Sequence, residues 1–283
     1  MRPRPGSGPG AAEREPVARA LDMLAWVAAE NRESWSVRGV AREIEVSPAT
    51  VHRIFRSLES RNLLRRVDDG TYVLGLEFVR MSAHVLRQFS LGDLARPYLI
   101  NLTSITGESS LFGIYDEQRS EMMFTERVDS PHPLHYLVGL HQWRELYAGA
   151  TGLSILAFLP LDQRQAVYAR NLKALTGRTL TSGDTLEAAA ERIRQTGYAC
   201  TQGQRTAGAV GLGVPVLDSD GLVLGNICLT LPEQRFSPER EPELAGYVTA
   251  AAKALSAQLA DLSYSRRLLP LGPALDTSSS RAR

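Results

Sequence analysis

Two short amphipathic helices separated by only two residues are the feature that most constrains how this chain folds. Ser36 is a helix-capping residue, and apolar residues then recur at helical spacing over 37–44. Ser47 followed by Pro48 marks the start of a second helix, because serine caps free backbone N–H groups and proline suits the first helical position. Two helices joined this tightly predict a helix-turn-helix.

The second helix presents two faces of different character. Its apolar residues fall at i, i+3, i+4 and i+7 and form one stripe, which consists of Val51, Ile54, Phe55 and Leu58. Arg53 and Arg56 lie on the opposite face, with His52 beside them. By itself this pattern is also that of an ordinary amphipathic surface helix. Within a helix-turn-helix it is the pattern of a recognition helix whose arginines enter a DNA major groove.

A β-hairpin signal follows the second helix directly. Asp68-Asp69-Gly70 separates two β-prone runs, 64–67 and 71–74, and Asp-Gly between such runs is a strong turn signal. A hairpin in this place is the wing of a winged helix-turn-helix. It predicts that three residues lie near a phosphate backbone: Arg65, Arg66 and Tyr72.

The charge of the chain is concentrated in this same segment. The 283 residues carry a net charge of only +1, yet 36–66 contains seven arginines against three glutamates. Lysine occurs only at Lys173 and Lys253, so almost every basic side chain is an arginine. Arginine forms forked hydrogen bonds with phosphate and with guanine edges, which agrees with DNA binding.

The run Val37–Leu74 resembles the DNA-binding domain of the IclR family of bacterial transcriptional regulators. The resemblance rests on Ser47-x-x-Thr50-Val51-His52-Arg53 and on Tyr72-x-Leu74-Gly75. It implies binding to double-stranded operator DNA, with Ser47, Thr50, His52, Arg53 and Arg56 at the major groove and Ser36, Arg38, Arg65, Arg66 and Tyr72 on the backbone. Glu45 departs from the family, which commonly has glycine there; a left-handed backbone at Glu45 costs ~1 kcal/mol.

The remaining chain predicts an α+β fold with five parts. We expect a disordered arm over 1–14, the winged helix-turn-helix over 15–75, a linker helix over 76–91, a GAF-like antiparallel sheet domain with helices over 92–264, and a disordered tail over 265–283. The expected strands of that domain are 110–115, 122–128, 134–140, a short strand near 146–147, a strand around 198, and a hairpin of 210–217 with 222–231. A helix from 238 to 262 closes it. The succession resembles the effector domain of IclR regulators.

Two features of the second domain suit a ligand. The small residues of 149–154 lead into a helix start, where free backbone N–H groups favour a carboxylate, although small residues also permit tight packing. Strand 225–230 places small polar side chains on one face and apolar ones on the other. The family resemblance implies an effector site at these two features and on the neighbouring strands, made of Ala150, Thr151, Gly152, Thr201, Gly211, Cys228 and Thr230. The resemblance implies a small organic acid, while Thr201 and Leu153 depart from common family residues and leave its identity open.

Several other functions have little support in the sequence. Two cysteines form no disulfide framework, and no apolar run reaches the ~18 residues of a membrane span. His132 and His135 fall on opposite faces of an extended segment, so they are not expected to share a metal ion. The sequence also gives no reason to expect a cofactor. We expect a cytoplasmic protein that associates with itself as a dimer or a dimer of dimers. The alternatives are a bifunctional enzyme with an accessory winged helix, and a DNA-binding oligomer that takes no effector.

Overall fold

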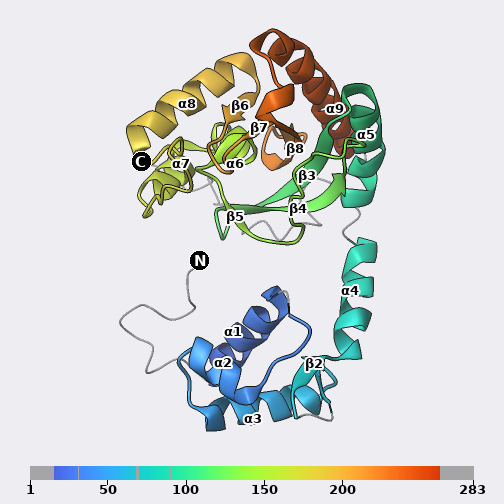
Figure 1. Cartoon of the computed structure of the whole chain (residues 1–283), viewed down its shortest axis with the longest axis vertical. Coiled ribbons are helices and arrows are strands. Elements are labelled where there is room, and N and C mark those ends of the chain that lie inside the picture. Colours follow the sequence, from blue (N-terminus) through green and yellow to red (C-terminus); the bar gives the residue numbers. More distant parts are fainter. Residues whose placement is uncertain (1–15, 31, 68–69, 89–90, 262–283) are drawn as a thin grey trace, which may run out of the picture. The chain divides into compact units, whose positions relative to one another are not determined.

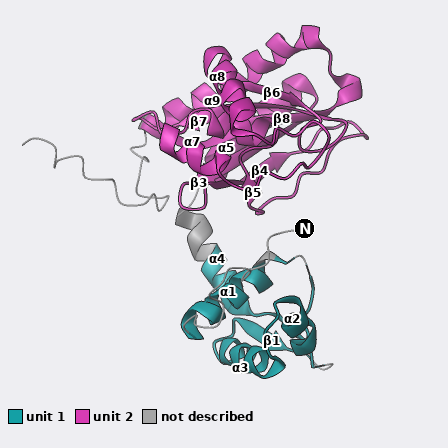
Figure 2. Ribbon diagram, turned by 90° about the vertical axis from the view of Figure 1, so that its left-hand side faces the viewer, with its two compact units in different colours: residues 1–88 teal, residues 89–283 magenta. Residues whose placement is uncertain are grey.

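The computed structural model describes residues 16–30, 32–67, 70–88 and 91–261, and the chain divides into two compact units, 1–88 and 89–283 (Figure 2). Each unit is treated by itself below. The predicted arm over 1–14, the predicted tail over 265–283 and the turn residues 68–69 lie outside the described residues.

The first unit is a winged helix-turn-helix, as predicted. Its elements follow in the order α1 (Pro16–Ala29), α2 (Val37–Glu43), α3 (Pro48–Glu59), β1 (Leu64–Arg66), β2 (Tyr72–Leu74) and α4 (Leu76–Gln88). Trp35 extends the two-stranded wing, because its N–H and its carbonyl both bond to Tyr72, at 2.8 Å each. Beneath the wing, the rings of Phe55 and Tyr72 pack edge to face with centroids 4.9 Å apart.

Gly75, directly before the linker helix α4, packs against the segment that follows the recognition helix α3. A Cβ at Gly75 would lie 2.0 Å from the carbonyl oxygen of Asn62, so only glycine fits without moving the backbone. The Gly75 N–H bonds to the carbonyl of Leu63 at 2.8 Å, and the Glu77 N–H bonds to that of Asn62 at 3.2 Å. The start of α4 is therefore fixed to the segment that follows α3.

The second unit is an antiparallel sheet covered by helices on both faces (Figure 1). Its strand order is β5-β4-β3-β8-β7-β6. The strands are β3 (Ser109–Asp116), β4 (Glu121–Val128), β5 (Arg144–Glu145), β6 (Ala199–Gln202), β7 (Ala209–Leu217) and β8 (Val223–Pro232). The helices are α5 (Leu91–Thr106), α6 (Gly149–Leu156), α7 (Leu161–Tyr168), α8 (Gly183–Thr196) and α9 (Glu241–Asp261), with 3-10 turns Glu233–Arg235 and Pro238–Arg240 before α9.

Strand β8 divides the core of the second unit into two layers. Ile227, Leu229 and Leu231 pack with α5 and α9 on one face of the sheet. Cys228 packs on the other face with the helices α6 and α8. The alternation predicted for this strand is confirmed.

Three predictions for the second unit are corrected. Residues 134–140 form a loop instead of a strand. Pro131 and Pro133 before it offer no N–H to a ladder, and the carbonyl of Val138 accepts a hydrogen bond from the Arg127 side chain instead. The short strand expected near 146–147 is β5, two residues earlier, and the closing helix begins as a 3-10 turn at Pro238 and becomes α-helical at Glu241.

Candidate nucleic-acid interface and effector site

The start of the recognition helix α3 is held by its own hydroxyl groups. The Ser47 hydroxyl accepts a hydrogen bond from the Thr50 N–H at 3.2 Å and lies 2.9 Å from the Thr50 hydroxyl. Ser36 caps α2 in the same way, accepting from the Gly39 N–H at 3.1 Å. These three predicted DNA-contact residues therefore set where the two helices begin.

The two faces of α3 separate as the sequence predicts. Val51, Ile54, Phe55 and Leu58 are all buried in the core of the first unit. His52, Arg53 and Arg56 are exposed. Burial of one face therefore leaves the other, with its two arginines, accessible to a partner outside the unit.

The arginines of the first unit fall into two groups. Arg32 is engaged with Glu43 through two hydrogen bonds of 2.8 Å, and Arg61 folds back onto the Ser57 carbonyl at 2.9 Å. A second group makes no hydrogen bond or ion pair with another described residue: Arg38, Arg53, Arg56, Arg65 and Arg66. All five are exposed, and so is Arg42, which interacts electrostatically with Glu43. Exposed arginines gathered in one small unit favour a polyanionic partner.

Tyr72 does not belong with those arginines. Its side chain is 2% exposed and lies in the core against Phe55, so the prediction that it contacts a phosphate backbone is wrong.

Arg42 is an exposed arginine of this unit that the sequence analysis omitted. It stands one helical turn after Arg38 on α2, and that spacing was a signal for the same face.

The seven predicted effector residues come together around the start of α6. Thr201, Gly211 and Thr230 stand side by side on β6, β7 and β8, since Thr201 pairs with Gly211 and Gly211 pairs with Thr230. The Cys228 thiol donates to the Thr151 hydroxyl at a sulfur–oxygen distance of 3.5 Å. Cβ of Ala150 lies 3.2 Å from the position of a Cβ at Gly211, so the helix rests on that glycine.

One of the backbone N–H groups that were predicted to bind a carboxylate at the start of α6 is already hydrogen-bonded within the protein. The Ala150 N–H donates to the Thr201 hydroxyl at 2.8 Å, so this backbone group is not free. Gly152 faces away from the strands, because a Cβ there would lie 2.4 Å from the Leu146 carbonyl. Gly152 therefore permits close packing, whereas Thr151, Gly211 and Thr230 are half-buried and remain open to a ligand.

Comparison with known families decides the identity. A model described as the IclR helix-turn-helix domain matches residues 16–68, and one described as the bacterial transcriptional regulator IclR C-terminal domain matches residues 83–257. This chain belongs to the IclR family. It is therefore a DNA-binding transcriptional regulator with an effector-binding C-terminal domain, in a family of regulators and not of enzymes.

Individual IclR relatives match over most of the chain. The HTH-type transcriptional regulator Rv1719 of Mycobacterium tuberculosis is 29% identical over 235 residues, covering 83% of this chain and 88% of that protein. KdgR of Escherichia coli is 26% identical over 232 residues, covering 81% and 87%. The crystal structure of the Thermotoga maritima IclR matches with a TM-score of 0.67 and 25% identity, covering 86% of this chain and 98% of that one. An IclR homologue of Microbacterium hydrocarbonoxydans shares the fold, with a TM-score of 0.74, 20% identity, and coverage of 87% and 99%.

The buried cysteine of this IclR regulator, Cys228, has a thiol of low reactivity. Burial raises the pKa of the Cys228 thiol to about 12, so the thiol is protonated at neutral pH. A protonated, inaccessible thiol is a poor nucleophile. Cys228 therefore packs in the core against α6 and donates a hydrogen bond to Thr151.

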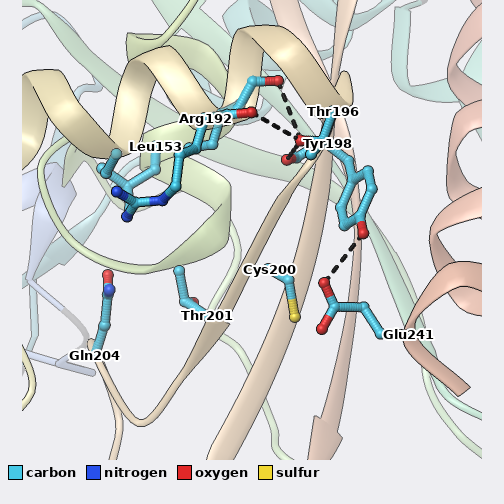
Figure 3. Close-up of a pocket in the computed structure, with 10 residues that line it drawn as sticks. Leu153, Arg192, Thr196, Tyr198, Cys200, Thr201, Gln204 and Glu241 are labelled. Atoms are coloured by element: carbon cyan, nitrogen blue, oxygen red, sulfur yellow. Dashed lines mark hydrogen bonds between the residues drawn. The ribbon is translucent and has the colours of Figure 1, made fainter. Parts of the chain in front are cut away.

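A cavity of about 200 Å³ lies beside the predicted effector residues, and only Thr201 of those seven lines it. The cavity runs along β6 between the C-terminal half of α8 and the start of α9 (Figure 3). Arg192 enters it from α8 and Gln204 from the loop after β6, and the sequence analysis singled out neither residue. Elsewhere, the described residues contain no cluster of histidine, cysteine or carboxylate side chains suited to a metal ion, and none of their helices is long and apolar enough to cross a membrane.

The turn between α2 and α3 carries the backbone strain that the sequence suggested. Glu45 has φ +57°, in the left-handed region that glycine adopts freely. Replacing Glu45 with glycine relieves a cost of ~1–2 kcal/mol, partly offset by the ~0.5–1 kcal/mol of added freedom in the unfolded chain. We expect Glu45→Gly to stabilise the first unit by ~0.5–1 kcal/mol in urea unfolding followed by circular dichroism.

The matched control is Glu45→Ala, which removes the same side chain and its interactions but keeps the left-handed strain. If Glu45→Gly is no more stable than Glu45→Ala, the backbone at residue 45 is not strained.

Proposed function

We propose that the first unit reads operator DNA with α3 in the major groove and the wing on the phosphate backbone. The observation that carries this proposal is the exposed, uncompensated arginine face of a helix whose other face is fully buried. Arg53 and Arg56 then contact base edges, with His52 beside them. Arg38, Arg65 and Arg66 contact phosphates, and the hydroxyls of Ser36, Ser47 and Thr50 hold the helix starts beside the same backbone.

We propose further that the chain dimerises through the first unit. Val17 and Leu21 on α1 are 66% and 60% exposed, and Leu76 and Val79 on α4 are 72% and 61% exposed. Apolar side chains so exposed in one small unit favour cover by a second copy. Two copies related by a twofold axis present two recognition helices to two half-sites about 34 Å apart.

We propose that the second unit takes a small organic acid beside the start of α6, at Thr151, Gly211 and Thr230. The half-buried hydroxyls of Thr151 and Thr230 provide donors, and Gly211 lets the start of α6 pack closely on the strands that carry the site. The Microbacterium relative was crystallised with 4-hydroxybenzoate, which supports an acid as the class of effector. Ala150, Gly152, Thr201 and Cys228 support this site by packing and by hydrogen bonding.

Loss of Arg53 tests the DNA-reading proposal. We expect Arg53→Ala to weaken binding to an operator selected from random DNA by ~1–3 kcal/mol and to relax the preference at one base, because a forked arginine–base contact is lost. Gel shift with wild-type and mutated operators measures both effects. Arg61→Ala is the matched control, since Arg61 is bound to Ser57 and not free. Equal affinity and equal preference in Arg53→Ala would remove Arg53 from the reading face.

A charge on the exposed face of α4 tests the dimer proposal. We expect Val79→Glu to lower the mass of the assembly in sedimentation velocity, because the substitution places a carboxylate in an apolar interface. Leu161→Glu on α7 is the control, since Leu161 is 55% exposed and lies in the other unit. The same mass for wild type and Val79→Glu at every concentration contradicts the proposed interface.

Thermal shift tests the effector proposal. A ligand that binds only the folded protein stabilises it by ~2.7 kcal/mol at one hundred times its dissociation constant. We expect 4-hydroxybenzoate or another small acid in a screen of carboxylic acids to raise the melting temperature, and Thr230→Val to reduce that effect. If no acid in the screen moves the melting curve or the operator affinity, the proposed class of effector is wrong.

A further inference from the structure

The cavity beside β6 contains two polar side chains, Arg192 and Gln204, whose end groups have no hydrogen-bond partner among the described residues. Its lining combines an apolar wall with a guanidinium, a hydroxyl and a side-chain amide. Leu153, Ala189 and Ile193 form the apolar wall and are all buried. Figure 3 shows the guanidinium of Arg192 and the amide of Gln204 extending toward each other across the space beside Thr201.

Arg192 differs from its neighbour on the same helix. Arg194 is used within the fold, donating to the Ala157 carbonyl at 3.1 Å and to Glu187 at 3.0 Å. Arg192 is exposed, and its guanidinium makes no hydrogen bond or ion pair with any residue that the structure describes. A guanidinium that lines a cavity without a carboxylate partner can receive an anion there, and its planar fork matches a carboxylate.

Gln204 is positioned by its backbone while its side chain is left unpaired. The Gln204 carbonyl accepts hydrogen bonds from the hydroxyls of Thr179 at 2.6 Å and Thr176 at 3.2 Å. The Oε1 atom of its amide is buried and has no hydrogen-bond partner among the described residues. Buried acceptors are rarely left unpaired in folded proteins, so this amide favours a bound molecule that donates an O–H or N–H.

Thr201 supplies a third group at the same place. Its hydroxyl oxygen accepts the Ala150 N–H, which leaves the hydroxyl proton available to an acceptor in the cavity. At the other end of the cavity, the Glu241 carboxylate accepts the Tyr198 hydroxyl at 3.1 Å. A negative charge at that end directs an anion toward the Arg192 end.

We propose that this cavity is a second ligand site, which binds a small aliphatic carboxylate bearing a hydroxyl group. The carboxylate pairs with Arg192 and with the Thr201 hydroxyl, the ligand hydroxyl donates to Gln204 Oε1, and the short alkyl part rests on Leu153, Ala189 and Ile193. The site is separate from the proposed effector residues except for Thr201, so it does not depend on what those residues bind.

The test uses the full-length protein and 2-hydroxybutyrate, with butyrate as the comparison lacking the hydroxyl. The side-chain Nε–H resonance of Arg192, assigned by its loss in Arg192→Gln, reports contact directly in a nitrogen–proton NMR titration. We expect a saturable shift of that resonance and tighter binding of 2-hydroxybutyrate than of butyrate. Saturation-transfer NMR gives the affinity of each variant, and Arg192→Gln should bind at least tenfold more weakly.

Two further variants separate this site from others. Arg96→Gln removes one exposed arginine on α5 and should leave the affinity unchanged. Gln204→Leu should abolish the preference for 2-hydroxybutyrate over butyrate, because it removes the amide acceptor and keeps the side-chain volume. An Arg192 resonance that does not move, or equal affinity in Arg192→Gln, overturns the proposal. Loss of binding in Thr230→Val but not in Arg192→Gln also overturns it, and places the ligand at the proposed effector residues.

Discussion

Burial of one face of α3 is the constraint on which the DNA-binding unit depends. Val51 and Phe55 are fully buried, and Tyr72 from the wing closes over Phe55. A helix fixed in this way cannot rotate to hide its arginines, since rotation would expose the apolar stripe to water. Arg53 and Arg56 therefore remain at the surface without partners in the described structure, and their charge is available to a polyanion.

Close backbone approach has the corresponding role in the second unit. A Cβ at Gly213 would lie 2.8 Å from the Ala150 carbonyl oxygen, so α6 packs directly on β7. Asn226 on β8 holds the helix from the next strand, donating to the Thr151 carbonyl at 2.7 Å and to the Ser154 hydroxyl at 2.9 Å. Together with the bond from the Ala150 N–H to Thr201, these contacts bring the N-terminal turn of α6 onto three strands at once.

Sequence patterns predicted the elements well where local signals were strong. The helix caps at Ser36 and Ser47, the apolar stripe of α3 and the alternation of β8 all depend on neighbours in the chain, and each is confirmed. The strand that was wrongly predicted over 134–140 shows where local patterns fail, because the Val138 carbonyl is bound by the Arg127 side chain and not by a neighbouring strand. Tyr72 was misassigned for a related reason: its place on a strand was predictable, but which face met the core depended on Phe55. The cavity beside β6 is lined mostly by residues of 189–204, but it exists only because α8, β6 and the loop after β6 fold around one space with Leu153 and Glu241, which the sequence pattern does not show.

Left-handed backbone conformations lie on both sides of α3, in addition to the Ser47 cap at its start. Glu45 at φ +57° makes the turn that precedes the helix, and Asn62, also at φ +57°, ends the segment that follows it. Asparagine tolerates this conformation better than glutamate does, since its short amide can bond locally. Gly75 then packs on the Asn62 carbonyl and bonds to Leu63, one residue before α4 begins. Turning α4 about this point would break the bonds of Gly75 and Glu77 to that segment, so these contacts oppose rotation of the first turn of α4 against the segment that follows α3.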